Sequence, residues 1–226
     1  FEALKSYEGC YETWFSELFG EQISWDVIDA PYGDELPAPE KIERLLITGS
    51  PVSIYERREW SVSCSQWLAK IWERGVPILG ICYGHQLMAD ALGGEVSAST
   101  KGREMGAIDV LQCGEDLLFS GLDRQFSVWQ THIDEVSRAP EVAEIIATND
   151  HCPIQAMAIG DHCRTVQWHP EMNKAIMSHY VEARREAIEA QWGEGSAIEL
   201  LQSLPEEVLS GSMIAQNFMS HWLELT

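Results

Sequence analysis

The stretch PILGICYGHQL, residues 77–87, decides how this chain folds. An apolar run ends at a Gly-x-Cys-x-Gly sequence, and residues 86–92 continue with helical character. Strand, sharp turn and helix in this order are typical of a nucleophile elbow, with Cys82 where a hydrolase would carry serine. Gly80 and Gly84 would permit a strained turn and a close approach of strand and helix. The helix N-terminus would favour the reactive thiolate. The alternative is a buried structural cysteine.

The segments on either side of the elbow predict an α/β fold. Residues 44–48 form an apolar run that breaks at Gly49, and residues 57–74 carry apolar side chains at helical spacing up to Gly75. Alternating strands and helices favour a parallel sheet with helices on both faces. The middle of the chain then holds short strand candidates divided by Gly, Asp and Pro turns, at residues 95–99, 107–111, 126–129, 142–147, 154–158 and 164–168. We therefore predict a flavodoxin-like, open, twisted and mostly parallel sheet with a small antiparallel extension.

The two ends of the chain complete this prediction. Residues 1–19 have the spacing of an amphipathic helix, residues 23–28 alternate as a strand does, and residues 173–191 form a long helical pattern. Residues 193–226 read as a helical tail, and all 226 residues fit a single domain. An α/β domain would normally lead with a strand, and no methionine opens the sequence. We therefore expect that a first strand is missing upstream of Phe1.

The composition limits the partners of the chain. Lys and Arg number 15 against 36 Asp and Glu, which gives a net charge of −21. Such a surface repels phosphate backbones and anionic membranes, so we predict neither a nucleic-acid nor a membrane partner. No apolar stretch has the length of a membrane span, and no signal-peptide pattern opens the sequence. Six cysteines without a Cys-x-x-Cys pair predict a reducing, cytoplasmic location.

Two His-Cys pairs, at residues 151–152 and 162–163, offer four side chains that bind metals. Adjacent residues of a strand point to opposite faces, so each pair would need a turn before its two side chains could converge. We therefore predict no metal site, and no other feature of the sequence calls for a cofactor.

The chemistry of Cys82 requires a base and a residue that orients the base. His169 follows the strand candidate at residues 164–168, and Glu171 lies two residues further on. If the two strands are parallel neighbours, Cys82 and His169 open onto the same edge of the sheet. Glu171 would then accept a hydrogen bond from the imidazole and fix its tautomer. His85 is the competing base, but it lies within the elbow itself.

Attack on a carbonyl also requires hydrogen-bond donors for the developing oxyanion. The amide of Tyr83, directly after the nucleophile, is one natural donor. The turn at Gly49 and Ser50 follows an earlier strand and supplies the other. Each of these features is a weak signal alone. The hypothesis of a cysteine-dependent hydrolase rests on their occurrence together, because three separate strand ends each supply a different part of the site.

With these residues named, the chain resembles the class I, triad-type glutamine amidotransferases. GICYGHQ at residues 80–86 resembles that family's nucleophile motif, and QWHPE at 167–171 resembles its second catalytic motif. ITGSP at 47–51 resembles the oxyanion loop, although many members carry a second glycine where Ser50 stands. VWQTHID at 128–134 resembles a further motif near the bound glutamine, with Thr131 where serine is common. KGREMG at 101–106 is also similar, and the likeness is closest to the stand-alone GMP-synthase-like branch.

The resemblance implies hydrolysis of the glutamine side-chain amide through a γ-glutamyl thioester on Cys82, with release of ammonia and without a cofactor. The residues that it implies are Cys82, His169 and Glu171 as the catalytic triad, Gly49, Ser50 and Tyr83 as the oxyanion hole, and Gln86, Thr131 and His132 as the substrate-binding residues.

Other functions remain open at this point. The chain leaves only about forty residues after Arg184, too few for a second catalytic domain, so ammonia would pass to a separate synthetase subunit. The domain could instead act alone on γ-glutamyl peptides, because the same thioester chemistry serves both substrates. A catalytically silent relative that binds a ligand or a partner, and a cysteine hydrolase of an unrelated substrate, are the remaining alternatives.

Overall fold

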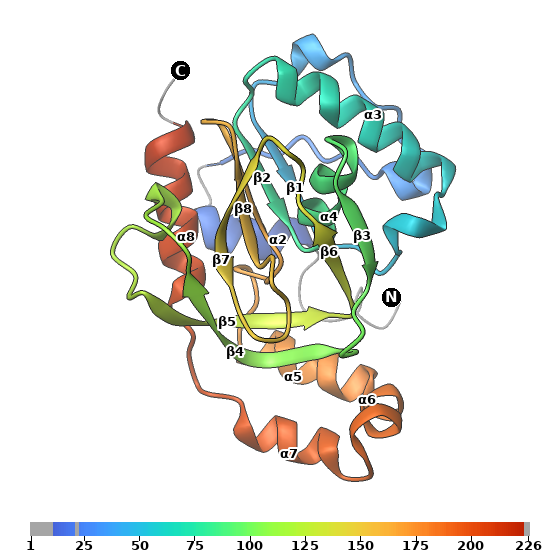
Figure 1. Ribbon diagram of the computed structural model, residues 1–226, viewed down its shortest axis with the longest axis vertical. Helices are drawn as coiled ribbons and strands as arrows, with labels where there is room; N and C mark the ends of the chain where they lie inside the picture. Colours follow the sequence, from blue (N-terminus) through green and yellow to red (C-terminus); the bar gives the residue numbers. More distant parts are fainter. Residues whose placement is uncertain (1–10, 21–22, 224–226) are drawn as a thin grey trace.

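The computed structural model describes residues 11–20 and 23–223, and its centre is a seven-stranded sheet (Figure 1). The strands lie in the order β1-β2-β9-β8-β7-β4-β5. β2 pairs in parallel with both β1 and β9, and the other four pairings are antiparallel. β3 and β6 form a separate antiparallel pair. The strands are β1 (Leu45–Ile47), β2 (Ile78–Ile81), β3 (Glu95–Ala98), β4 (Glu104–Gln112), β5 (Gln125–His132), β6 (Asp134–Arg138), β7 (Ala143–Thr148), β8 (Ala156–Ile159) and β9 (Cys163–Val166).

The predicted α/β class is confirmed, and the sheet divides into two parts. The parallel strands β1, β2 and β9 form one side, and every residue of β2 and β9 is buried. The antiparallel extension is larger than expected, because β8, β7, β4 and β5 all belong to it. β4 and β5 pair along most of their length, from Glu104 opposite His132 to Leu111 opposite Gln125. β8 and β9 are joined by residues 160–162 alone, which are too few for the crossover that a parallel pair needs.

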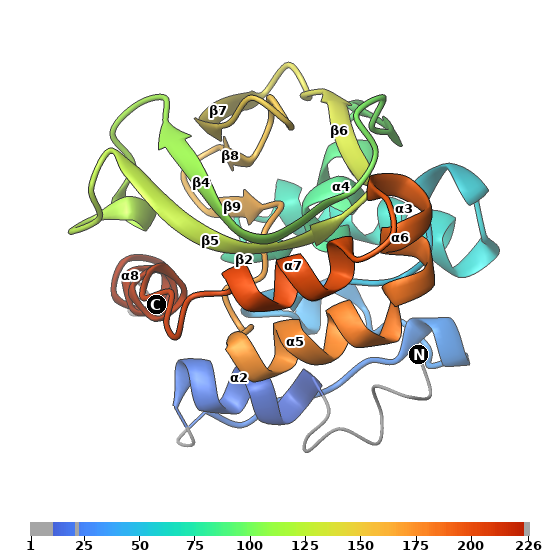
Figure 2. The ribbon, with the colours of Figure 1, turned by 90° about the horizontal axis from the view of Figure 1, so that it is seen from below.

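Helices cover both faces of the sheet. α3 and α4 pack in one apolar cluster with Ile78, whereas α2 and α8 pack in another with Leu79. Successive strand residues point to opposite faces, which is why these two neighbours belong to different clusters. α2, α5 and α7 lie stacked on one side of β5 (Figure 2). The helices are α2 (Tyr11–Phe19), α3 (Glu59–Glu73), α4 (Tyr83–Ala91), α5 (Lys174–Ala183), α6 (Arg185–Trp192), α7 (Ser196–Ser203) and α8 (Ser210–Phe218), and a π-helical turn (Met219–Leu223) follows α8.

Two predicted elements differ from the structure. Residues 23–28 are not a strand; instead, Ile23 and Trp25 pack against the apolar cluster that contains Leu79. The helix predicted over 173–191 breaks at Arg184, where φ is −117°. The break lets Ile188 pack in the same cluster as Tyr180 of α5. The predicted helix over 1–19 is α2 from residue 11 onward, and its first ten residues lie outside the described part.

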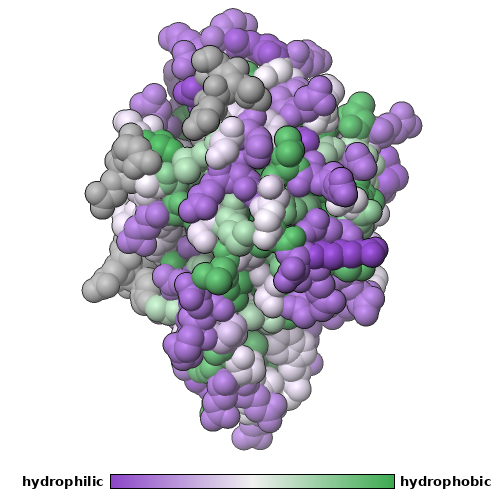
Figure 3. All heavy atoms as spheres, turned by 90° about the vertical axis from the view of Figure 1, so that its left-hand side faces the viewer, coloured by the Kyte–Doolittle hydropathy of each residue, from purple (hydrophilic) through white to green (hydrophobic). Residues whose placement is uncertain are grey.

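The surface is largely hydrophilic, as the composition requires. Figure 3 shows hydrophobic residues scattered between hydrophilic ones on one face of the molecule. Within the described residues, no helix combines the length and the apolar character needed to cross a membrane. Five cysteines of the described part are free, and four of them are buried.

Candidate active site

Cys82 occupies the turn between β2 and α4, and its backbone is strained there. Its φ of +51° and ψ of −99° lie outside the regions that side chains with a Cβ normally adopt. The amide of Cys82 donates to the carbonyl of Val166 at 2.8 Å, and its carbonyl accepts from the amide of Gln86 at 3.1 Å. Strain of this kind persists where the surrounding structure holds it, and it is common at reactive positions.

The glycines of the elbow allow the close packing that the sequence predicts. A Cβ at Gly80 would lie 2.8 Å from the carbonyl oxygen of Gly84, and a Cβ at Gly84 would overlap the carbonyl of Ile47. Each of these two Cβ atoms would be closer to its neighbour than real Cβ atoms come to other atoms. The start of α4 therefore rests directly on β1 and β2, and any larger residue at these positions would push Cys82 out of place.

His169 approaches Cys82 from the end of the neighbouring strand, and Glu171 binds His169. Ile81 of β2 lies opposite Val166 of β9 in the parallel register, so both strands end at the same edge. Nδ1 of His169 hydrogen-bonds Oε1 of Glu171 at 2.7 Å, and the backbone amide of His169 donates to the carbonyl of Trp129 at 2.9 Å. With Nδ1 bound to the carboxylate, Nε2 is the nitrogen available to Cys82.

The electrostatics of this group favour a protonated His169. Burial lowers the pKa of His169, but the charges of Glu171 and Cys82, and hydrogen bonds to both, outweigh burial and hold that pKa well above its usual range. The imidazolium form of the ring is therefore the form that this environment stabilises. An imidazolium beside the sulfur stabilises a thiolate and provides a proton for a leaving group.

The turn at Gly49 and Ser50 lies against both reactive side chains. A Cβ at Gly49 would be 2.9 Å from Cε1 of His169 and 3.7 Å from Cβ of Cys82. Ser50 lines the same cavity as Cys82 and His169. The amide of Tyr83 belongs to the first turn of α4, where backbone N–H groups have no partner within the helix. The phenol of Tyr83 instead hydrogen-bonds Ser61 at 2.7 Å.

A cavity of about 320 Å³ opens beside Cys82 and His169, a volume in the lower range of small-molecule sites. Nε2 of Gln86 donates to the carbonyl of Asp134 at 2.9 Å and to Oε1 of Gln167 at 3.2 Å, which fixes the orientation of the Gln86 amide. All three side chains that the resemblance assigns to substrate binding line this cavity: Gln86, Thr131 and His132.

The structure adds residues that the sequence analysis did not assign. Nε2 of Gln167 lies 3.6 Å from the sulfur of Cys82. The buried carboxylate of Glu104 accepts from His132 at 2.9 Å, from Asn149 at 2.7 Å and from Gln155 at 2.9 Å. Burial raises the pKa of Glu104, but these hydrogen bonds and the nearby histidine outweigh burial and lower it. Glu104 is therefore an anion, and it holds His132 in place. The sequence signal for Glu104 was the similarity of KGREMG at residues 101–106 to the family.

His85, the competing base, does not line the cavity. Its ring is fully buried, with Nδ1 2.8 Å from Oγ1 of Thr165 and Nε2 3.1 Å from the carbonyl oxygen of Ile154. Burial lowers its pKa to about 3. His85 is therefore a neutral side chain that ties α4 to the sheet.

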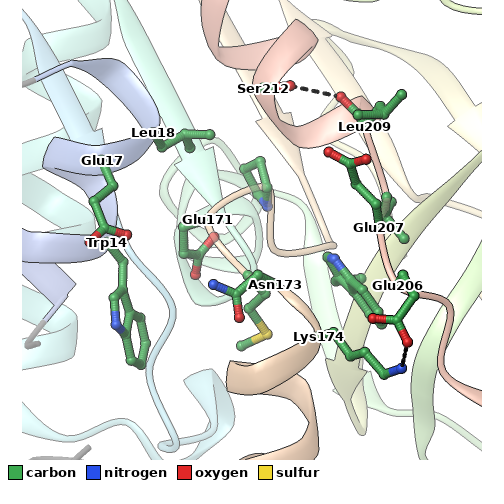
Figure 4. A pocket seen from close by; sticks show the side chains of 14 residues that line it. Trp14, Glu17, Leu18, Glu171, Asn173, Lys174, Glu206, Glu207, Leu209 and Ser212 are labelled. Carbon is green, nitrogen blue, oxygen red and sulfur yellow. Dashed lines mark hydrogen bonds and ion pairs between the residues drawn. The ribbon is translucent and has the colours of Figure 1, made fainter. Parts of the chain in front are cut away.

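A second cavity, of about 280 Å³, borders Glu171 but neither Cys82 nor His169. Glu171 lines it together with Trp14 of α2 and Asn173, the residue that caps α5 (Figure 4). Within the described residues, Oε2 of Glu171 is buried and has no hydrogen-bond partner. Glu171 thus lines this second cavity, whereas Cys82 and His169 line the first.

Comparisons with known proteins identify the family to which this chain belongs. The family model "Glutamine amidotransferase class-I" matches residues 19–184. "Gamma-glutamyl peptidase 3" of Arabidopsis thaliana is 29% identical over 96% of this chain and 92% of that protein. "GMP synthase [glutamine-hydrolyzing]" of Leifsonia xyli is 36% identical over 88% of this chain, which spans only 40% of that protein's length.

Solved structures share the fold. A glutamine amido transferase from Methylobacillus flagellatus has a TM-score of 0.81 at 24% identity, over 93% of this chain and 88% of its own. A glutamine amidotransferase from Thermotoga maritima has a TM-score of 0.76 at 24% identity, over 92% of this chain and 89% of its own.

Proposed function

Since the chain belongs to the class I glutamine amidotransferase family, we propose that it hydrolyses a γ-glutamyl amide bond through a thioester on Cys82. The single observation that carries this proposal is the geometry around His169. Its Nδ1 is bound to Glu171 while its ring interacts with Cys82 at the common edge of β2 and β9. The family's members are in general cysteine-dependent hydrolases.

The first half of the reaction forms the thioester. The thiolate of Cys82 attacks the γ-carbonyl carbon of the substrate, and the carbonyl oxygen becomes an oxyanion. The amides of Tyr83 and Ser50, in the turn with Gly49, stabilise this oxyanion. His169 donates its Nε2 proton to the leaving nitrogen, the C–N bond breaks, and ammonia or an amine departs.

The second half releases glutamate. His169, now neutral, takes a proton from a water molecule, and the resulting hydroxide attacks the thioester carbon. The C–S bond breaks, glutamate leaves and the thiolate of Cys82 is restored beside an imidazolium. Glu171 keeps the ring in one tautomer and stabilises its positive form in both halves. Gln86, Thr131 and His132 hold the glutamyl part of the substrate, and no cofactor enters any step.

Two leaving groups fit this chemistry. With glutamine the product is ammonia, which a separate synthetase subunit would accept, and the likeness to glutamine-hydrolysing GMP synthases supports this substrate. With a γ-glutamyl peptide the product is an amino acid or a shorter peptide. The likeness to a γ-glutamyl peptidase extends over 96% of this chain and 92% of that protein, and this supports the second substrate.

The proposal is tested by incubating the protein with glutamine and with γ-glutamyl dipeptides. We expect release of ammonia or of the amine, and a γ-glutamyl adduct on Cys82 that mass spectrometry detects after rapid acid quenching. Cys82→Ala should abolish both signals, whereas Cys113→Ala, at an exposed cysteine that does not line the cavity, should retain them. Hydrolysis by Cys82→Ala at the wild-type rate would refute the mechanism.

A further inference from the structure

Two arginines line the cavity that contains Cys82, and the proposed mechanism uses neither of them. Arg103 directly precedes β4, and Arg184 lies at the break between α5 and α6. The two residues are far apart in the sequence, and the fold brings both to the wall of one small cavity. Their guanidinium groups are potential partners for an anionic part of the substrate.

The positive charges of this pair are uncompensated within the described part of the chain. There, no carboxylate lies within 4.0 Å of either guanidinium, and Nε of Arg103 is buried without a hydrogen-bond partner. Burial, and secondarily the charge of Arg184, lower the pKa of Arg103. The neighbouring Arg185 behaves differently, because it pairs with Glu182 at 2.6 Å and approaches Glu189 at 3.7 Å. A buried donor and two cations that repel each other would be stabilised by an anion bound between them.

The structure also holds both arginines in place. The guanidinium of Arg184 lies over the ring of Tyr180, 4.6 Å from its centroid, and Tyr180 lines the same cavity. The backbone amide of Arg103 donates to Oε1 of Gln191 on α6 at 3.2 Å, so the segment before β4 is fixed to α6 (Figure 2). A ligand would therefore meet side chains that are already partly ordered, which lowers the entropic cost of binding.

From these observations we propose that Arg103 and Arg184 form a carboxylate subsite for the leaving group, which selects γ-glutamyl peptides over glutamine. This inference rests on the proposed γ-glutamyl hydrolysis. Glutamine carries one carboxylate, whereas a γ-glutamyl peptide carries a second one on its leaving amine and is a net anion at neutral pH. The chain has a net charge of −21, so such a substrate needs local cations at the site.

The test compares two substrates of similar size, γ-glutamylglycine and γ-glutamylethylamide, of which only the first has a carboxylate on its leaving group. We expect the wild-type protein to prefer γ-glutamylglycine. In Arg184→Met the ratio of kcat/KM for γ-glutamylglycine to that for γ-glutamylethylamide should fall about tenfold, mainly through KM, and Arg103→Met should act in the same direction. Arg184→Lys should keep part of the preference.

Arg185→Met is the matched control, since that arginine is adjacent in sequence and is paired on the surface. It should leave the ratio unchanged. An unchanged ratio in a folded, active Arg184→Met variant would overturn the subsite. An equal loss for both substrates would also overturn it, because the arginines would then hold the glutamyl carboxylate. If the wild-type protein hydrolyses neither substrate, the proposed function itself fails, and this result is distinct from the other two.

Discussion

His85 tests how the nucleophile elbow is built, because the sequence makes it the competitor of His169. The carbonyl of Ile154 can only accept, so Nε2 of His85 carries the proton and Nδ1 accepts from the hydroxyl of Thr165. The ring is fully buried, and no carboxylate is among its partners. Burial therefore lowers the pKa of His85 to about 3. We predict that replacing it, in His85→Gln, makes the protein less sensitive to acid.

The magnitude follows from proton linkage. In the unfolded chain a histidine has a pKa of about 6.5, so between about pH 6.5 and pH 3 the unfolded state binds a proton that the folded state does not. The free energy of unfolding therefore falls with decreasing pH across this window, by about 1.4 kcal/mol per pH unit. From pH 7 to pH 5 the loss due to His85 is about 2 kcal/mol. This loss should be absent in His85→Gln.

The assay is urea unfolding followed by tryptophan fluorescence at pH 7 and at pH 5, for the wild-type protein and for His85→Gln. The quantity to compare is the difference in the free energy of unfolding between the two pH values, because any direct cost of the substitution cancels in it. Between pH 8 and pH 7 both proteins should change by the same amount, since His85 is largely neutral in both states there. An equal loss of stability between pH 7 and pH 5 in the two proteins would refute this reasoning.

Two further predictions concern the proposed triad. Gly49→Ala should lower kcat about a hundredfold, because its Cβ would press on Cε1 of His169 and displace the ring; Gly114→Ala, whose Cβ would meet only Glu144 at an ordinary 3.8 Å, should retain the wild-type kcat. Glu171→Gln should lower kcat about a thousandfold or more. Removing the negative charge also lowers the pKa of His169, so the imidazolium, and with it the alkaline limb of the pH–rate profile, should be lost at a lower pH than in the wild-type protein. An unshifted limb would contradict the role of Glu171.

The fold was predictable where its signals are local. The apolar run of β2 and the glycines of the elbow identify a strand and a sharp turn without knowledge of their neighbours. The pairing of strands was not predictable in this way, because it depends on contacts between segments that are distant in the sequence. β6 (Asp134–Arg138) was not predicted, since this mixed polar segment becomes a strand only by pairing with β3.

Two predicted elements were wrong, the strand over residues 23–28 and the unbroken helix over 173–191, and both errors have the same physical origin. Residues 23–28 alternate because Ile23 and Trp25 face the apolar cluster that contains Leu79, and alternation records this burial rather than a paired neighbour. The helical pattern over 173–191 continues across Arg184 because Tyr180 and Ile188 pack in the same cluster on both sides of the break. An apolar pattern therefore shows which side chains are buried, and it does not show where the backbone turns.

Alternation of side chains along an extended segment also explains Gln167, which the sequence analysis did not assign to the site. Trp168 is 1% exposed and packs with Phe119 and Phe126 on one side of the chain that leaves β9. Residues before and after it in an extended segment point to the opposite side. Gln167 and His169 must therefore face the same way, toward Cys82, and Nε2 of Gln167 does lie 3.6 Å from the sulfur. A buried tryptophan next to a candidate base was thus a sequence signal for Gln167. The glutamine donates toward the sulfur of Cys82 while its Oε1 accepts from Gln86, and both Cys82 and Gln86 line the same cavity.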